Sequence, residues 1–300
     1  MFIEQAYKGN TSLFRYLIIP LGFMGFMGLN YIALLNSEAD TKELMTQMID
    51  QLGANTVLII NLLPLVLGFF FMLFWFKFIL NLPLKSAISS RSKVDFKRIV
   101  FSFMLWGTVV GGLTFVEIFS SPENFVWNFD QQKFITFAII AVLLIPLQTS
   151  FEELLFRGHM IQGIGVHTKS RAAALIITSV LFGLMHIANP EVGELGYGIL
   201  AYYIGTGFLF GIITLMDEGL ELVLGFHAAN NLIGALLVSA EWTAFRVDSL
   251  YIDISKPELD YTMWIPLLII YPLILIILAK KYNWSNWNTR LFGKVNAPSE

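Results

Sequence analysis

Eight apolar stretches, each about 20 residues long, dominate the chain, and this is the length that a helix needs to cross a membrane. Of the 300 residues, 56% are hydrophobic and only 14% are charged, whereas soluble domains carry about 25% charged residues. The sequence therefore predicts an all-α, polytopic membrane helical bundle with about eight transmembrane helices. The expected spans are 17–35, 57–80, 99–119, a fourth from about 134 into the 151–160 stretch, 172–187, 197–216, 220–240 and 264–279.

Composition and spacing also limit the number of domains and the classes of partner. No segment between the apolar stretches is long enough for a soluble domain, so residues 1–300 are predicted to form a single integral-membrane domain. A net charge of −3 and a pI near 5.8 argue against a nucleic-acid partner. The chain has no cysteine, which excludes cysteine nucleophiles, disulfides and thiolate metal sites. The first apolar stretch is long for a signal peptide, and we interpret it as a retained helix.

Charges in the loops predict the orientation, because lysine and arginine concentrate in cytoplasmic loops. Basic residues occur in the second and fourth loops and in the C-terminal tail: Lys85, Arg91, Lys93, Lys97, Arg98, Lys169, Arg171, Lys280, Lys281, Arg290 and Lys294. The intervening loops are acidic, which predicts a multi-pass protein with both termini in the cytoplasm, in the inner or plasma membrane if the source is bacterial. The sixth loop departs from this pattern because it contains Asp217, Glu218 and Glu221.

The stretch FEELLFRGHM, residues 151–160, places charged side chains inside an apolar region, where each costs about 3 kcal/mol or more. On a helix, Glu153 and Arg157 are four residues apart and face each other with the acid first, which is the favourable order. Glu152 lies about 100° around the helix, so its carboxyl group remains free for chemistry. It is a candidate general base or acid. The alternative is that both glutamates are solvated at the end of a cytoplasmic helix.

Two further clusters place histidines in apolar helices. Phe182 and His186 are four residues apart in the fifth stretch, and His227 and Asn231 have the same spacing in the seventh. Either cluster alone fits packing or hydrogen bonds between helices. Together with Glu152, they can activate a water and stabilise the tetrahedral intermediate of amide hydrolysis.

A zinc site is the other chemistry that these residue types allow. Two histidines and a glutamate form a known catalytic zinc ligand set, so Glu152, His186 and His227 are candidate metal ligands. The compact HExxH motif is absent. Zinc is therefore a cofactor that the sequence allows without requiring it.

The three clusters match, in order, the EExxxR, FxxxH and HxxxN/D motifs of a known family. The chain resembles the CPBP intramembrane endopeptidases, which include CAAX prenyl-protein proteases and bacteriocin-processing or immunity (Abi) proteins. The resemblance covers about residues 134–240, the core that carries the motifs. It implies an intramembrane protease of glutamic or metallo type, a hydrolase that cleaves membrane-associated protein or peptide substrates and has the lipid bilayer as its other partner.

The resemblance also implies a role for each residue. Glu152 and His186 would activate the attacking water, and His227 and Asn231 would stabilise the oxyanion. Glu153, Arg157 and Phe182 would support the site structurally. Two rival functions remain: a non-proteolytic scaffold that regulates partner enzymes, and, with less support, a transporter.

Two features are left for the tertiary structure to decide. If the fifth span is straight, Glu152 and His186 lie deeper from the cytoplasmic side than His227, so a common site requires a tilted fifth span or a partly submerged 189–197 loop. His159 is seven residues after Glu152, on nearly the same helical face. The hypothesis is that His159 lies in the access path and tunes Glu152; the alternative is an ordinary histidine at the headgroup level.

Overall fold

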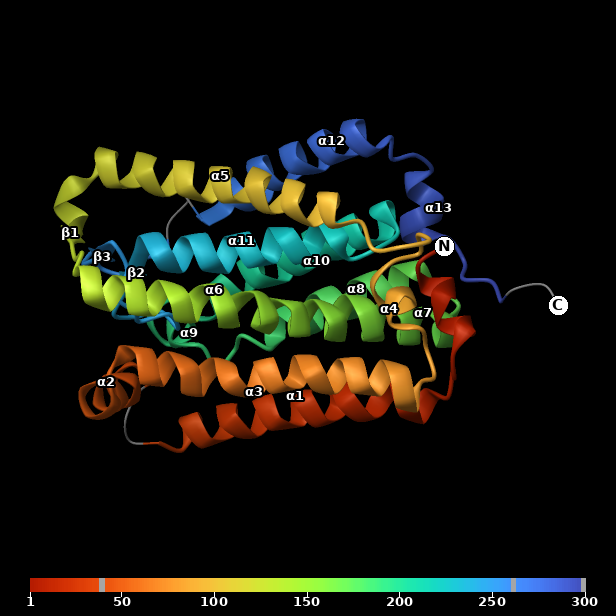
Figure 1. The fold of residues 1–300 in the computed structure, drawn as a ribbon, viewed down its shortest axis with the longest axis horizontal. Helices are drawn as coiled ribbons and strands as arrows, with labels where there is room; N and C mark the ends of the chain where they lie inside the picture. Colours follow the sequence, from red (N-terminus) through yellow and green to blue (C-terminus); the bar gives the residue numbers. More distant parts are fainter. Residues whose placement is uncertain (38–40, 260–262, 298–300) are drawn as a thin grey trace.

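The computed structural model describes residues 1–37, 41–259 and 263–297, most of which form helices that run side by side along the long axis of the molecule (Figure 1). The helices in chain order are η1 (Ile3–Lys8), α1 (Leu13–Leu35), α2 (Thr41–Leu52), α3 (Ala54–Phe74), η2 (Trp75–Ile79), α4 (Leu84–Ile88), α5 (Phe96–Ser120), η3 (Pro122–Asn124), α6 (Gln131–Glu153), η4 (Leu154–Met160), α7 (Ile161–Thr168), α8 (Arg171–Leu184), α9 (Pro190–Leu195), η5 (Tyr197–Ile199), α10 (Leu200–Asp217), α11 (Glu221–Leu237), η7 (Pro266–Ile270), α12 (Tyr271–Tyr282) and α13 (Trp287–Phe292). The chain is thus a polytopic helical bundle, as the sequence predicts.

All eight predicted spans are helical, but they differ in length. Five helical segments of the described residues are long and apolar enough to cross a membrane: Leu13–Leu35, Ala54–Ile79, Phe96–Ser120, Gln131–Thr168 and Tyr197–Asp217. Two predicted spans are shorter apolar helices, because α8 already ends at Leu184 and α11 at Leu237. The eighth predicted span, 264–279, falls in η7 and α12. A count of eight crossings therefore stays a prediction.

Several helices expose on one side large apolar side chains of the kind that a soluble protein would bury. Phe14 of α1, Phe96 and Phe119 of α5, and Leu268 of η7 are each at least 70% exposed. Such an exposed apolar surface is typical of helices that face lipid tails.

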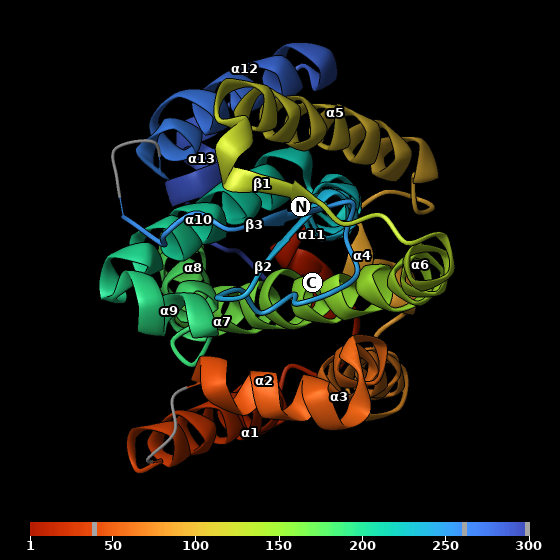
Figure 2. The same cartoon turned by 90° about the vertical axis from the view of Figure 1, so that its left-hand side faces the viewer.

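Glycines allow the inner helices to approach closely. A Cβ atom on Gly225 of α11 would lie 2.0 Å from the backbone oxygen of Ile99 in α5. On Gly207 of α10, it would lie 2.5 Å from the backbone oxygen of Ser179 in α8. Small residues at such contacts let the backbones of membrane helices approach each other. The inner helices α5, α6, α8, α10 and α11 therefore form a close-packed body, whereas α1, α2 and α3 form a layer on one side of it (Figure 2).

A small sheet covers the end of the bundle away from the termini (Figure 1). It comprises β1 (Phe125–Trp127), β2 (Val238–Ala240) and β3 (Tyr251–Asp253), in the order β1-β3-β2. β1 pairs antiparallel with β3, and β2 pairs parallel with it. The sequence prediction extended the seventh helix to residue 240, but the last three of those residues form β2 and end the helix.

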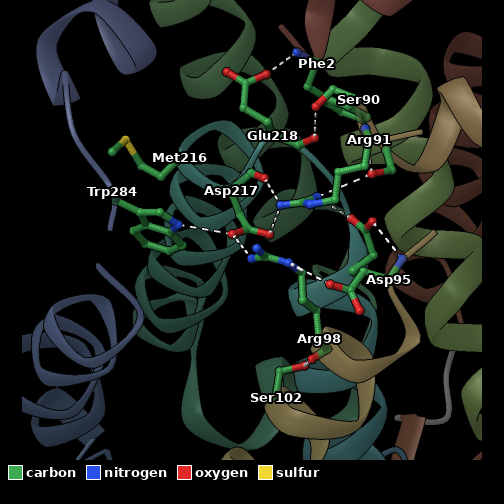
Figure 3. A network of polar contacts seen from close by, with 12 residues as sticks. Phe2, Ser90, Arg91, Asp95, Arg98, Ser102, Met216, Asp217, Glu218 and Trp284 are labelled. Carbon is green, nitrogen blue, oxygen red and sulfur yellow. Dashed lines mark hydrogen bonds and ion pairs between the residues drawn. The ribbon is translucent and has the colours of Figure 1, made fainter. Parts of the chain in front are cut away.

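The N-terminus and the last described residues, up to 297, lie at the opposite end together with α4, α7 and α13, so the predicted basic segments gather there (Figure 1). The acidic sixth loop lies in the same region, and its charges are paired. Asp217 contacts Arg91 at 2.8 Å and Arg98 at 2.5 Å, and Glu221 contacts Arg91 at 3.1 Å (Figure 3). The side chains of Asp217 and Glu221 are 1% and 0% exposed. The loop is acidic because it neutralises arginines from α5 and the preceding loop.

The same network connects the two ends of the chain. Glu218 accepts a hydrogen bond from the Phe2 backbone and pairs with Arg290 of α13 at 3.1 Å. The indole of Trp284 donates to Asp217 over 3.1 Å (Figure 3). The turn between α10 and α11 is therefore attached to the N-terminal segment, to α5 and to the C-terminal tail. This attachment fixes the start of α11, which carries His227.

Candidate active site

The charged stretch lies where α6 changes into the π-helix η4. α6 ends at Glu153, and the following seven residues, Leu154–Met160, form wider turns. Short π-helical segments inside α-helices occur frequently at functional sites. Glu152 is 4% exposed, and Glu153 and Arg157 are fully buried.

Arg157 and Glu153 form the ion pair that their spacing predicts. The Arg157 guanidinium donates from Nη1 to Glu153 Oε1 at 3.2 Å and from Nη2 to the backbone oxygen of Gly207 at 3.1 Å. Its Cζ atom also lies 4.1 Å from the centre of the Phe182 ring, a cation–π contact. Arg157 therefore joins η4 to α8 and α10, and Phe182 is the aromatic surface on which it rests.

Glu153 has a second partner that the sequence did not indicate. His227 of α11 contacts Glu153 Oε1 through Nδ1 at 2.7 Å. Glu153 forms an ion pair with Arg157, and a carboxylate in an ion pair accepts hydrogen bonds, so we assign the hydrogen to Nδ1 of His227. The other ring nitrogen, Nε2, lies 3.7 Å from Glu152 Oε2. A carboxylate thus sets both the tautomer and the direction of the His227 ring.

Glu152 is held by Gln148, a residue that the sequence interpretation missed. Gln148 Nε2 donates to Glu152 Oε1 over 2.5 Å, and Gln148 Oε1 accepts from Asn231 Nδ2 over 3.4 Å. Gln148 precedes Glu152 by four residues on α6, and this spacing could have identified it. The second carboxylate oxygen, Glu152 Oε2, is buried and has no hydrogen-bond partner among the described residues.

Asn231 belongs to a short chain of amides on α11. Asn230 Nδ2 donates to Asn231 Oδ1 at 3.1 Å, and Trp106 of α5 donates to Asn230 Oδ1 at 3.0 Å. The neighbouring Asn230 therefore orients Asn231. The Asn231 amide nitrogen is left directed toward α6, where it reaches Gln148.

His186 lies in the turn that follows α8, two residues beyond the last helical residue, Leu184. Its Nδ1 contacts the Phe182 backbone oxygen at 2.9 Å, and its ring stacks on Tyr203 of α10 at 4.1 Å with an angle of 7°. α8 ends just before His186, and the chain continues through a turn into α9. The two explanations for a common depth, a tilted fifth span and a partly submerged 189–197 loop, both stay predictions.

The four predicted catalytic residues line one cavity of 1370 Å³ (Glu152, His186, His227 and Asn231), and Phe182 and Gln148 line it too. Its opposite wall is formed by apolar residues of α1, α2 and α3, among them Phe23, Met48 and Leu65. Sites for small ligands usually enclose about 300–1,000 Å³. This cavity is large enough for an extended peptide segment beside the polar cluster.

His159 does not lie in this cavity, and the hypothesis that it tunes Glu152 is wrong. The His159 side chain is fully buried, contacts the backbone oxygen of Tyr16 at 3.0 Å and stacks on the Tyr16 ring at 4.8 Å. The prediction assumed an α-helix from Glu152 onward. The π-helix changes the direction of the later side chains, so His159 packs against α1.

The zinc prediction depends on how closely the nitrogen and oxygen ligands converge. Within the described ranges 1–37, 41–259 and 263–297, no three His, Asp or Glu side chains form a group that could hold a metal ion. His227 Nδ1 is also committed to Glu153. Zinc at Glu152, His186 and His227 stays a prediction, and the reaction proposed below uses only side chains and water.

Comparisons with known proteins place this site in a family. A family model described as Type II CAAX prenyl endopeptidase Rce1-like matches residues 131–233, the part that contains the four predicted catalytic residues and Gln148. The uncharacterized protein YyaK of Bacillus subtilis (strain 168) is 30% identical over 240 residues, which cover 77% of this chain and 80% of YyaK. The chain belongs to the Rce1-like family. The Rce1-like proteins are a protease family, and the apolar helices make this chain a multi-pass integral membrane member. No solved structure matches the chain.

Gln148 offers a test of how the Rce1-like site positions its carboxylate. We expect Gln148→Leu to lower kcat about 10- to 100-fold with little change in KM, because it removes the donor to Glu152 and the acceptor for Asn231. Gln131→Leu, at the exposed start of the same helix, is the matched control. Steady-state peptide hydrolysis checks both variants. An unchanged kcat in Gln148→Leu would show that this bridge does not matter.

Proposed function

We propose that this protein is an intramembrane endopeptidase that hydrolyses membrane-associated protein or peptide substrates with a glutamate-activated water. The observation that supports this best is the pair formed by Glu152 and His227. A free carboxylate oxygen faces the Nε2 atom of a histidine whose other nitrogen is fixed by a buried carboxylate. The 3.7 Å between them is too long for a direct hydrogen bond, and both side chains line the cavity, so the proposed water contacts both from the cavity side.

In the proposed reaction, Glu152, assisted by His186, takes a proton from this water while the water oxygen attacks the carbonyl carbon of the substrate. The carbonyl oxygen becomes an oxyanion, which the Asn231 amide and His227 stabilise by hydrogen bonds. Glu152 then returns the proton to the leaving amine, and the C–N bond breaks. Water attacks directly, so no acyl-enzyme forms.

The tautomer of His227 determines when its Nε2 atom can donate a hydrogen bond to the oxyanion. Because Nδ1–H is directed at Glu153, Nε2 can donate to an oxyanion only when the ring is doubly protonated. Glu153 holds the ring through Nδ1 and so directs Nε2 toward Glu152 and the proposed water. Glu153 thus does more than hold Arg157, because it also prepares His227 as a donor.

The decisive experiment is proteolysis of a peptide library by the purified protein in detergent. Cleavage by the wild type that is lost in both Glu152→Ala and His186→Ala would support the proposal, and cleavage retained in both would refute it. A protein that cuts no peptide and co-purifies with partners would instead be a scaffold. Metal analysis of the same preparation tests the zinc prediction.

We also propose that both termini are cytoplasmic, because the basic loops gather at the end of the bundle that carries them. Fusions of a reporter that is active only in the cytoplasm, placed at each end, test this orientation.

A further inference from the structure

The cavity beside the site is unusual in its charge. Among the described residues that line it, two are acidic, Glu152 and Glu191, and none is a lysine or an arginine. The remaining lining is mostly apolar, so its low dielectric strengthens the effect of each carboxylate. Glu152 is committed to the proposed reaction. Glu191 has no part in it.

Glu191 lies on α9, beyond the turn that carries His186, and α9 packs next to α2. Its Oε1 atom accepts a hydrogen bond from the backbone nitrogen of Ala244 over 2.9 Å. Its Oε2 atom is buried and has no hydrogen-bond partner in the described part of the chain. Among the described residues, no lysine or arginine forms an ion pair with Glu191. A buried carboxylate oxygen without a partner is costly, and a donor from a ligand would remove this cost.

Glu191 lies close to the reaction site along the chain, because it follows His186 by five residues. Glu191, His186 and Tyr203 line the same cavity, and the Tyr203 ring stacks on His186. An extended peptide spans about 3.3–3.6 Å per residue, so a group bound at Glu191 would lie only a few residues from the bond that is cut.

We propose that Glu191 binds a basic side chain, lysine or arginine, of the peptide substrate and so selects where the peptide is cleaved. This inference rests on the proposed peptidase function and adds a preference for cationic substrates. Burial raises the pKa of the Glu191 carboxyl group, and a bound ammonium or guanidinium group would favour its ionised form. Arginine can add a bidentate contact, whereas lysine supplies a point charge.

The test uses the full-length protein and N-acetylated peptides that differ at one position, which is occupied by lysine, arginine, glutamine or glutamate. The position is scanned across the residues on both sides of the cleaved bond. For wild type, we expect kcat/KM at one position to be about tenfold higher with lysine or arginine than with glutamine. In Glu191→Gln, this ratio should fall to near one. In Glu191→Lys, the glutamate peptide should become the preferred substrate.

Glu194 provides the matched control, because it lies on the same short helix but is exposed to solvent. Glu194→Gln should keep the wild-type ratio. The same symmetric elution from size exclusion in all variants shows that they fold. Free N-terminal amines in a second peptide set reveal whether an α-ammonium group replaces the side chain.

The outcomes separate this inference from the proposed function. If Glu152→Gln abolishes cleavage and Glu191→Gln keeps the wild-type ratio, the peptidase assignment stands and the cation site is wrong. A wild type that cleaves lysine and glutamine peptides equally at every position also overturns the cation site. If Glu152→Gln still cleaves, the proposed function itself fails.

Discussion

Replacing Glu152 with glutamine is expected to lower kcat for peptide cleavage by about 10²- to 10⁴-fold, the range over which general bases contribute. Glutamine has nearly the same shape, and its amide oxygen can still accept the hydrogen bond from Gln148. It cannot take a proton from water. The effect should therefore appear in kcat and leave the fold and KM nearly unchanged.

This prediction is checked by single-turnover cleavage of one identified peptide, with thermal unfolding measured in the same detergent. Glu152→Asp keeps the carboxylate but shortens its reach, so its activity should lie between those of the wild type and Glu152→Gln. The exposed Glu194→Gln is the control for loss of a charge. Retention of wild-type kcat in Glu152→Gln would remove Glu152 from the mechanism.

Replacing Arg157 with methionine should produce the largest loss of stability. Arg157 and Glu153 are both fully buried, and removing one partner of a buried ion pair costs about 3–5 kcal/mol because the other charge is left unpaired. The variant also loses the hydrogen bond to Gly207 and the cation–π contact with Phe182. Activity should fall as well, because Glu153 would no longer be held in place for His227.

A double-mutant cycle separates the charge effect from packing. Glu153→Gln in the Arg157→Met background removes the stranded carboxylate, so the double variant should unfold at a higher temperature than Arg157→Met alone. Lys93→Met, at an exposed position, is the control for loss of a cation. A double variant less stable than Arg157→Met would contradict the stranded-charge explanation.

Local spacing in the sequence predicted much of the scaffold. The apolar stretches are all helical, because a run of about 20 apolar residues can satisfy its backbone in lipid only as a helix. Spacing of four also predicted the Glu153–Arg157 pair, and the adjacent Glu152 indeed points to different partners. Both results depend on residues within one or two turns of the same helix, where geometry follows from the chain itself.

The sequence did not reveal how separate elements meet. The contact between Glu153 and His227 joins residues 74 positions apart, and Gln148 acquires its role only because Asn231 of another helix lies opposite. The π-helix after Glu153 could not be read from apolar spacing, and it turned His159 away from the site. The strands β1, β2 and β3 and the early end of α8 depend in the same way on tertiary contacts.

By itself, the sequence thus determined that the chain forms a helical membrane bundle and that Glu152 differs from Glu153. Only the tertiary structure decided that Glu153 holds His227, that α1, α2 and α3 form the far wall of the cavity, and that Glu191 lies unpaired in it. The reason is physical. Helix formation and i, i+4 pairs are local, whereas a cavity and its charges arise from side chains that packing brings together from distant parts of the chain.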